Sequence, residues 1–228
     1  MKNYRMNAVL AGAFYFFGTV MGIFAIVVAG QSSAGDVSVN LGAAPSRLTL
    51  GAFFIMLMGV LLSAMTVFLY PLFRKDSKEL ALGMVLFRGA LEGAGYIIAA
   101  LLWVLLAALS KEFSGTDSAT LHTVGNLVLE VSNKNGDIQT VFFIIGSICL
   151  YTSFYRTRLI PRWLTVWGLI GAAGIIAYAL LHFFHLDNGI GFWLQMIIFP
   201  QELVMGAWLV IRGFNQDAVK KLDEPPHS

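Results

Sequence analysis

The sequence predicts an all-α protein, a polytopic bundle of six membrane-spanning helices. Of its 228 residues, 57% are hydrophobic and only 12% are charged, whereas a soluble domain carries about 25% charged residues. The apolar residues also occur in long continuous runs rather than in the alternating pattern of a transmembrane strand. A run of about 20 apolar residues is long enough to cross the hydrocarbon core as a helix.

The six runs lie at residues 8–29, 49–72, 80–109, 138–155, 163–184 and 192–213. The first run is longer than the roughly 7–15 apolar residues of a secretory signal peptide, so we expect a retained helix. Pro71 is expected to end the second run. Residues 1–214 are therefore predicted to form a single transmembrane domain, followed by a polar cytoplasmic tail, 215–228, which we expect to fray.

The lysine and arginine residues predict how the helices cross the membrane. Placing the N-terminus in the cytoplasm puts eleven of the 15 basic residues on the cytoplasmic side, three outside, and Arg88 within the bilayer. This imbalance favours that orientation, because cytoplasmic loops are enriched in Lys and Arg. An even number of spans returns the C-terminus to the same side. We expect a multi-pass protein of a bacterial inner membrane, N-in and C-in.

The connection between the third and fourth runs contains a patterned segment. Residues 119–133, "ATLHTVGNLVLEVSN", carry apolar side chains on one helical face and polar side chains on the other. This pattern predicts a short amphipathic helix at the outer surface. It would either pack on its neighbours or cover an outward-facing cavity, and the pattern leaves both interpretations open.

Three ionisable residues fall inside the predicted spans. Arg88 and Glu92 stand four residues apart in the third run, and Glu202 lies near the middle of the sixth. Because a charge at the bilayer centre costs roughly 2.5–3.5 kcal/mol on insertion scales, each must face the protein interior and have a partner. A guanidinium can bind one carboxylate with two hydrogen bonds and still reach a second. Since two carboxylates outnumber one cation, we expect one carboxyl group to hold or share a proton.

Other polar residues extend this predicted site. Pro200 removes a helical donor and predicts a kink that frees the carbonyl group of Met196 beside Gln195. Tyr178 and His182 share a face of the fifth run and would line, with Gln195, a polar path from the outside. Alternatively, they are ordinary interfacial residues. The candidate ligand-binding residues are Arg88, Glu92, Tyr96, Tyr178, His182, Gln195 and Glu202.

Three segments carry a resemblance to a known family: "FRGALEGAGY" (87–96), "RLIPRWLTVWGLIG" (158–171) and "PQELVMGAWLVIRGF" (200–214). The chain resembles, over nearly its whole length, the bacterial membrane-protein family labelled domain of unknown function four-three-eight-six. The resemblance implies a six-span helical protein and implies no activity. The positions that match the family pattern are Arg88, Glu92, Pro200, Glu202 and Gly206.

Several functions are compatible with this sequence. A polar pocket at mid-membrane, open to the outer side, would bind or translocate a small polar molecule or a lipid headgroup. Alternatively, the glutamates would act as acid and base in an intramembrane lipid-modifying enzyme, or the charges would hold together an accessory or sensor subunit. One cysteine and no metal-site spacing predict no metal or cofactor. We expect membrane lipids as partners and no nucleic acid, and the oligomeric state stays open.

Overall fold

The computed structural model describes residues 4–29, 45–113, 119–184, 186 and 189–224. Over these residues the regular structure is helical and contains no strand. Six helical segments of the described chain are long and apolar enough to cross a membrane. The prediction of an all-α chain with six candidate spans is confirmed.

The third and sixth spans are each built from more than one helical element. The elements are α1 (Arg5–Ala29), α2 (Pro45–Asp76), α3 (Lys78–Gly83), the π-helix η1 (Met84–Leu91), α4 (Glu92–Phe113), α5 (Ala119–Thr157), α6 (Arg162–Phe183), α7 (Ile190–Met196), α8 (Ile198–Ile211) and α9 (Gln216–Asp223). The third span comprises α3, η1 and α4, and the sixth comprises α7 and α8.

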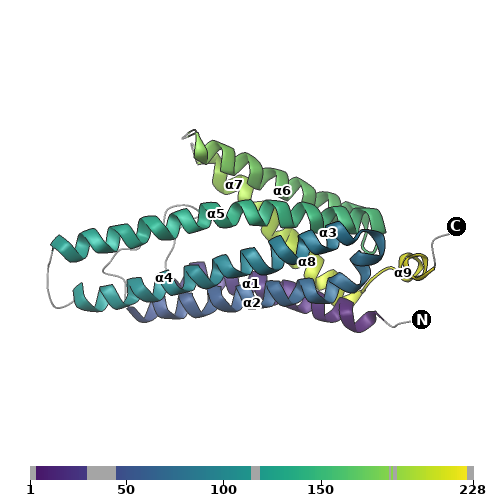
Figure 1. Cartoon of the computed structure of the whole chain (residues 1–228), viewed down its shortest axis with the longest axis horizontal. Helices are drawn as coiled ribbons and strands as arrows, with labels where there is room; N and C mark the ends of the chain where they lie inside the picture. Colours follow the sequence, from purple (N-terminus) through teal and green to yellow (C-terminus); the bar gives the residue numbers. More distant parts are fainter. Residues whose placement is uncertain (1–3, 30–44, 114–118, 185, 187–188, 225–228) are drawn as a thin grey trace.

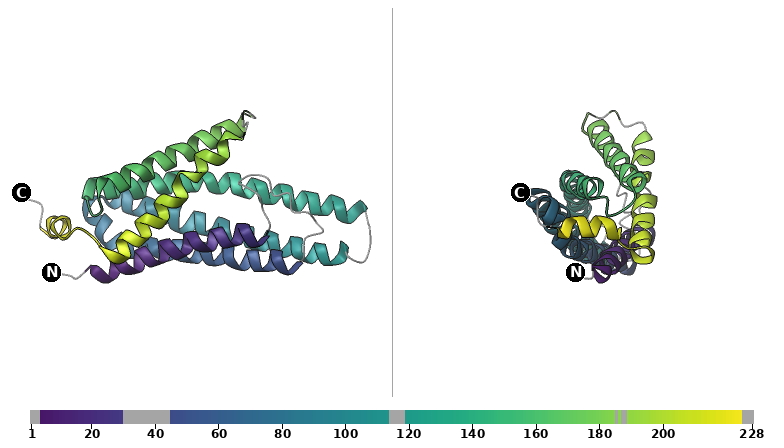
Figure 2. Two further views of the ribbon diagram at one scale, coloured as in Figure 1. Left: turned by 180° about the vertical axis from the view of Figure 1, so that it is seen from behind. Right: turned by 90° about the vertical axis from the view of Figure 1, so that its right-hand side faces the viewer.

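The long helices α2, α4 and α5 run along the length of the molecule, with α1 packed beside α2 (Figure 1). Helix α6 packs against α5 where α5 ends and then diverges from it. The polypeptide returns through α7 and α8, and α8 crosses the bundle to pack on α1 (Figure 2). This crossing brings the last span of the chain into contact with the first.

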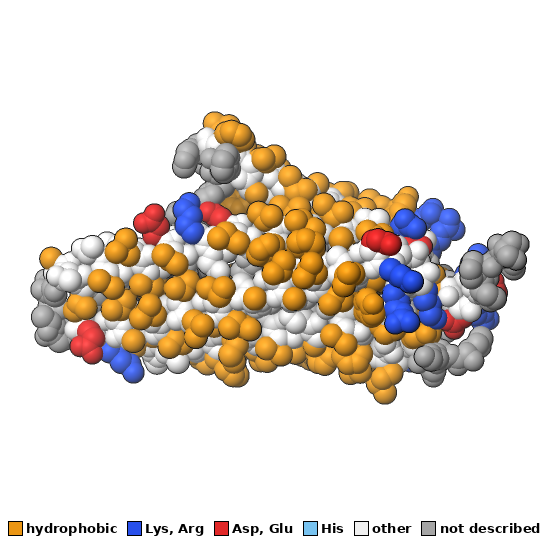
Figure 3. Space-filling model, in the orientation of Figure 1, with side chains coloured by type: hydrophobic (Ala, Val, Ile, Leu, Met, Phe, Trp, Pro, Cys, Tyr) orange, Lys and Arg blue, Asp and Glu red, His pale blue; other side chains and the backbone are white. Residues whose placement is uncertain are grey.

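One end of the bundle carries the start of α1, helix α9 and a concentration of Lys and Arg side chains, and we call it the basic end (Figures 1 and 3). Hydrophobic side chains cover most of the face between the two ends (Figure 3). The basic residues of this end include Arg5, Arg74, Lys75, Arg156, Arg158, Arg162 and Arg212. The segregation of charge from a long apolar surface is typical of a membrane-spanning bundle.

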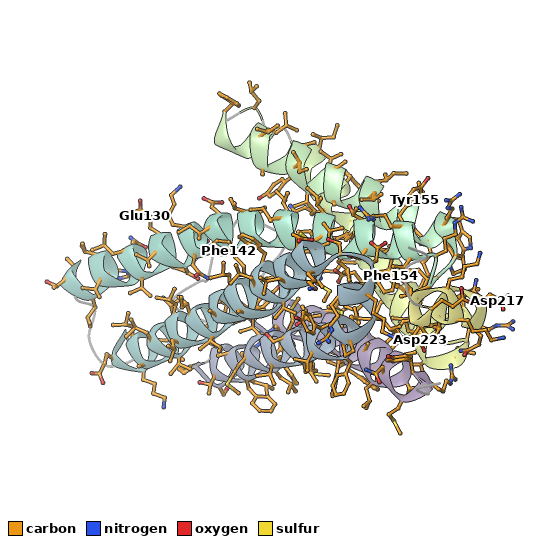
Figure 4. The ribbon with its side chains drawn as sticks, turned by 45° about the vertical axis from the view of Figure 1, so that its right-hand side comes forward. Glu130, Phe142, Phe154, Tyr155, Asp217 and Asp223 are labelled. Atoms are coloured by element: carbon orange, nitrogen blue, oxygen red, sulfur yellow. The ribbon has the colours of Figure 1, made fainter. Side chains whose placement is uncertain are left out.

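Residues 216–223, which we expected to fray, form a short helix docked at the basic end. The Asn215 side chain caps α9 by accepting a hydrogen bond of 3.0 Å from the Asp217 backbone amide. Ala218 and Val219 are buried, and Lys75 forms an ion pair with Asp223 (Figure 4). These contacts stabilise a helix that its polar composition did not predict.

Pro71 does not end the second span, because α2 continues through it to Asp76. A proline inside a helix removes one backbone donor and disturbs the carbonyl groups of the preceding turn. The Asn7 side chain of α1 donates a 3.0 Å hydrogen bond to the Phe68 carbonyl oxygen in that turn. The neighbouring helix α1 thus supplies a hydrogen-bond donor near the proline. Membrane helices tolerate proline where neighbouring helices provide such donors.

The amphipathic segment at 119–133 is not a separate helix but the beginning of α5, which runs unbroken for 39 residues. At 1.5 Å per residue such a helix is about 58 Å long, well beyond the roughly 30 Å hydrocarbon core. Part of its apolar face packs at the end far from the basic end, where Val128 and Leu129 contact a small core that contains Leu48 and Leu106.

Small residues let α8 approach α1 closely. The buried face of α1 repeats every three to four residues and contains mostly Gly and Ala. A Cβ atom added at Gly12 would lie 2.6 Å from the Gly206 carbonyl oxygen and 2.6 Å from the Leu209 Cβ atom. Helix association in membranes depends on such close backbone packing, since lipid offers no hydrophobic driving force between helices.

Replacement of Gly12 by alanine should therefore destabilise the protein. We expect Gly12→Ala to lower the free energy of unfolding by about 1–3 kcal/mol, the usual cost of overpacking a tight interface. The matched control is Gly136→Ala, because Gly136 is exposed within α5 and an added Cβ atom would meet nothing within 4 Å. That control should be neutral or stabilising by about 0.5–1 kcal/mol.

Thermal unfolding of both variants in detergent measures the difference. Equal unfolding temperatures for Gly12→Ala and Gly136→Ala would show that α1 and α8 are not in tight contact.

Candidate functional site

The candidate site begins with an irregular turn in the third span. Residues 84–91 form a π-helix, in which the Glu92 amide reaches back to the Phe87 carbonyl oxygen. Ser63 of α2 donates a 2.7 Å hydrogen bond to the Gly89 carbonyl oxygen and so supplies a donor from outside the helix. π-helical turns are uncommon and concentrate at functional sites. The one in this span carries Arg88.

Arg88 binds both predicted acidic partners. Its Nη1 atom donates to Glu92 Oε1, one turn later in the same span, and its Nη2 atom donates to Glu202 Oε1 of α8 at 2.7 Å. The side chains of Arg88, Glu92 and Glu202 are 1%, 0% and 4% exposed. We call these three residues, with the Tyr and Thr side chains that bind them, the polar centre.

Glu202 is held by donors from two other helices. Its Oε1 atom also accepts a 3.0 Å hydrogen bond from the Tyr15 hydroxyl, and its Oε2 atom accepts one of 2.9 Å from Thr19 Oγ1. Tyr15 and Thr19 lie one turn apart on α1, and Arg88 comes from η1. Every carboxylate oxygen of Glu202 therefore has a donor, as a buried ionised group requires.

A chain of polar contacts extends from Glu202 to α5 and α6. The Tyr15 and Tyr151 hydroxyl oxygens are 3.1 Å apart, and Tyr151 donates to Gln201 Oε1 at 2.8 Å. The Gln201 amide nitrogen in turn donates to the Leu164 carbonyl oxygen of α6 at 3.1 Å. This chain connects α1, α5, α6 and α8 through fully buried side chains.

Glu92 is less completely bound than Glu202. Its Oε1 atom accepts from Arg88 and, at 3.1 Å, from the Tyr96 hydroxyl. Its Oε2 atom is buried and has no hydrogen-bond partner among the described residues, and the same holds for Arg88 Nε. Buried polar atoms almost always find a partner. The polar centre thus keeps unused acceptor and donor capacity beside Glu92.

One face of α5 closes the site around Arg88. The Phe143 ring centroid lies 4.5 Å from the Arg88 guanidinium carbon, a cation–π contact. A Cβ atom added at Gly146 would lie 2.6 Å from the Arg88 backbone nitrogen. Ser147, one turn after Phe143 on this face, is fully buried, and its hydroxyl has no hydrogen-bond partner in the described part of the chain.

The sixth span is broken where Pro200 predicts a kink. Helix α7 ends at Met196 and α8 begins at Ile198, so that Pro200 lies in the first turn of α8, where a proline is tolerated. Gln201 and Glu202 follow directly. Both ion-paired spans are therefore interrupted as regular α-helices next to the residues of the polar centre, although Ile197 itself keeps α-helical dihedrals (φ −66°, ψ −35°).

The structure brings together four of the seven predicted site residues. Arg88, Glu92, Tyr96 and Glu202 are in mutual contact through the hydrogen bonds above. Tyr178 of α6 and Gln195 of α7 make no described hydrogen bond to them, although the Gln195 amide nitrogen is buried without a described partner. The backbone of His182 lies at the end of α6, and its side chain is outside the described residues.

Four site residues were missed in the sequence: Tyr15, Thr19, Tyr151 and Gln201. Tyr15 and Thr19 stand one turn apart on an otherwise apolar run, and Gln201 precedes Glu202. These positions gave a weak signal, since isolated Tyr and Thr side chains are common in membrane helices. In the described part of the chain, no group of three His, Cys, Asp or Glu residues is placed to hold a metal ion.

The profile of a family described as Domain of unknown function (DUF4386) matches residues 10–213. The chain belongs to the DUF4386 family. The matched range contains all six candidate spans apart from the first residues of α1, and it includes every residue of the polar centre. No curated protein and no solved structure matches this DUF4386 chain significantly.

Removing the cation of the polar centre should be strongly destabilising. We expect Arg88→Met to lower the free energy of unfolding by about 3–5 kcal/mol, because it leaves two buried carboxylates without their charged partner. The matched control is Arg156→Met, because Arg156 pairs with Asp76 at 2.8 Å while its side chain is 53% exposed. An exposed pair contributes about 0–1 kcal/mol.

Thermal unfolding in detergent compares the two variants. The charge balance supplies a second check, since replacing both acids by glutamine in the Arg88→Met background should recover much of the lost stability. If Arg88→Met and Arg156→Met unfold at the same temperature, Arg88 is not the cation that holds the carboxylates together.

Proposed function

We propose that the polar centre is the binding site of a membrane protein for a small polar ligand or a lipid headgroup that presents hydrogen-bond donors. The described conformation is its closed form, in which Arg88, Glu92 and Glu202 are almost wholly removed from the surface. In the open form the site communicates with the outer side of the membrane. Ligand binding of this kind would serve recognition or translocation.

The observation that carries this proposal is the incomplete binding of Glu92. A purely structural ion pair gains most when every buried lone pair and proton has a partner, as at Glu202. Glu92 Oε2, Arg88 Nε and Ser147 Oγ have none among the described residues. Glu92 Oε2 offers an acceptor and Arg88 Nε a donor to a polar molecule, and the acidic excess of the site favours a ligand with N–H or O–H groups.

Irregular backbone at two spans supports the same function. In hydrocarbon, non-helical or distorted backbone is tolerated where it is buried in protein or lines a cavity. Transporters place their sites at such interrupted helices. Here the π-helix carries Arg88, and the break between α7 and α8 precedes Glu202. Helix segments of this kind reorient at a lower cost than continuous helices.

Gln195 marks the route by which we propose that the site opens. Its buried amide nitrogen has no described partner, and it precedes the break in the sixth span. Helices α6 and α7 diverge from α5 away from the basic end (Figure 2). With the basic end in the cytoplasm, as the positive-inside tendency favours, this divergence faces the outer side of an inner membrane. Both termini would then be cytoplasmic.

A structural role for the charges is the competing function. The three donors at Glu202 favour it, because a fully bound carboxylate stabilises the bundle without any need for a ligand. The two functions differ in one observable property. A binding site must open to water, whereas a structural ion pair remains closed for as long as the protein is folded.

Cysteine accessibility tests for opening. In a Cys149→Ala background, we expect Ser147→Cys to react with a membrane-impermeant thiol reagent added to the outer side of intact cells. The matched control is Leu150→Cys, because Leu150 is equally buried one turn later on α5 but makes no polar contact. A tenfold faster reaction at Ser147→Cys than at Leu150→Cys corresponds to about 1.4 kcal/mol less opening free energy.

Leu127→Cys, at an exposed position near the start of α5, serves as the positive control for reagent access. Equal and negligible reaction of Ser147→Cys and Leu150→Cys, beside rapid reaction of Leu127→Cys, would refute a site that opens outward and favour the structural role. If Ser147→Cys reacts only when the reagent is added to inverted vesicles, whose cytoplasmic side faces out, the site opens to the cytoplasm. That result would contradict the proposed outward opening.

A further inference from the structure

A second polar feature lies at the basic end, apart from the polar centre. A hollow of about 470 Å³ opens between the loop that joins α5 to α6 and the loop that joins α8 to α9. The two loops are tied by a 2.9 Å hydrogen bond from the Asn215 amide to the Leu159 carbonyl oxygen. The hollow shares no residue with the polar centre, and its volume suits a small-molecule headgroup.

Three arginine residues line this hollow. Arg158, Arg162 and Arg212 are exposed, and none forms an ion pair with an acidic residue in the part of the chain that the structure describes. Other cations of the same end are already paired: Arg156 with Asp76 and Lys75 with Asp223. The hollow therefore concentrates positive charge that the protein leaves uncompensated.

Local backbone geometry holds these arginines in place. Arg158 has a φ of 54°, the left-handed conformation that non-glycine residues adopt at a cost of order 1 kcal/mol. Its amide still closes the last turn of α5 on the Phe154 carbonyl oxygen at 3.0 Å. Helix α6 begins at Arg162, so its positive dipole end also faces the hollow. The N-terminus of α6 carries partial positive charge, and together with the arginine side chains beside it this charge favours binding of an anion.

The walls of the hollow point to an amphiphile rather than a soluble anion. Trp208 lines it, and the Trp163 ring meets Trp208 edge-on with centroids 6.2 Å apart. Tryptophan pairs of this kind mark the headgroup level of a bilayer. Below them along α6, Val166 and Ile170 are exposed apolar residues on the same helical face as Trp163. Acyl chains would lie along this face.

We propose that this hollow binds the phosphate headgroup of an anionic phospholipid, with Arg158, Arg162 and Arg212 as the phosphate ligands. Guanidinium groups bind phosphate oxygens in pairs of parallel hydrogen bonds. Basic pockets between membrane helices on the cytoplasmic side recognise acidic lipid headgroups. The Arg162 guanidinium carbon also lies 4.9 Å from the ring centroid of Tyr155, and this cation–π contact orients Arg162. Tyr155 lies near the end of α5 (Figure 4).

The test is native mass spectrometry of the purified, delipidated protein titrated with phosphatidylglycerol or phosphatidylcholine. Wild type should retain phosphatidylglycerol in preference to phosphatidylcholine. The triple variant Arg158→Gln, Arg162→Gln, Arg212→Gln should bind phosphatidylglycerol on the order of 100-fold more weakly, because each basic residue near a membrane surface contributes about a factor of five. All three side chains are exposed, so the variant should unfold at the wild-type temperature.

The matched control removes three other exposed cations of the same end, Lys78→Gln, Lys220→Gln and Lys221→Gln, which do not line the hollow. It changes the net charge equally and should retain phosphatidylglycerol binding. An equal loss of phosphatidylglycerol binding in both triple variants would show that only the general electrostatic attraction of the basic end for anionic lipid is measured. That result would overturn the proposal. Displacement of phosphatidylglycerol by an equimolar amount of glycerol phosphate would identify a soluble phosphate ester as the ligand, and would overturn it too.

Discussion

The contact between Arg88 and its two carboxylates is the constraint on which the arrangement of the spans depends. Removal of three ionisable groups from water costs more than any single attraction between them returns, so additional donors are needed. Glu92 is local to the third span, but Glu202 is 114 residues away. Helix α8 must therefore cross the bundle and pack on α1, and the pair of glycines at that crossing, Gly12 and Gly206, makes the approach possible.

The same constraint explains why the backbone is irregular where it is. The π-helix at 84–91 and the break around Ile197 both lie within a few residues of the polar centre. Each irregularity creates backbone groups that lipid cannot satisfy. Ser63 supplies an additional donor to the Gly89 carbonyl oxygen of the π-helix, and neighbouring helices bury the rest of the distorted backbone. Helix α2 receives similar help from Asn7 near Pro71, but only the other two irregularities lie beside charged residues of the polar centre.

The polar centre and the basic end face different surroundings. Within the bundle, charge is tolerated only through direct pairing, and the acids outnumber the cation. At the basic end water screens the arginines, so three guanidinium groups stand close together around a hollow without acidic partners. As proposed above, the first site would select ligands that donate hydrogen bonds, and the second would select phosphate. A DUF4386 protein of this form would thus be anchored to acidic lipid at one end while its centre remains free to open.

Composition and run length alone determined that this chain is an all-α membrane protein with six spans, because burial of the backbone in lipid admits few alternatives. The depth of Arg88, Glu92 and Glu202 also follows from the sequence, since a buried charge demands a partner. Only the tertiary structure decided that Tyr15, Thr19, Tyr151 and Gln201 complete the site, and that α2 and α5 continue where breaks were expected. An uncharged Tyr, Thr or Gln side chain can lie in a membrane helix without an ionic partner, so the sequence does not indicate that it belongs to a site. The hydrogen-bond partners of these side chains come from other helices, and the order of the helices along the chain does not reveal which of them are in contact.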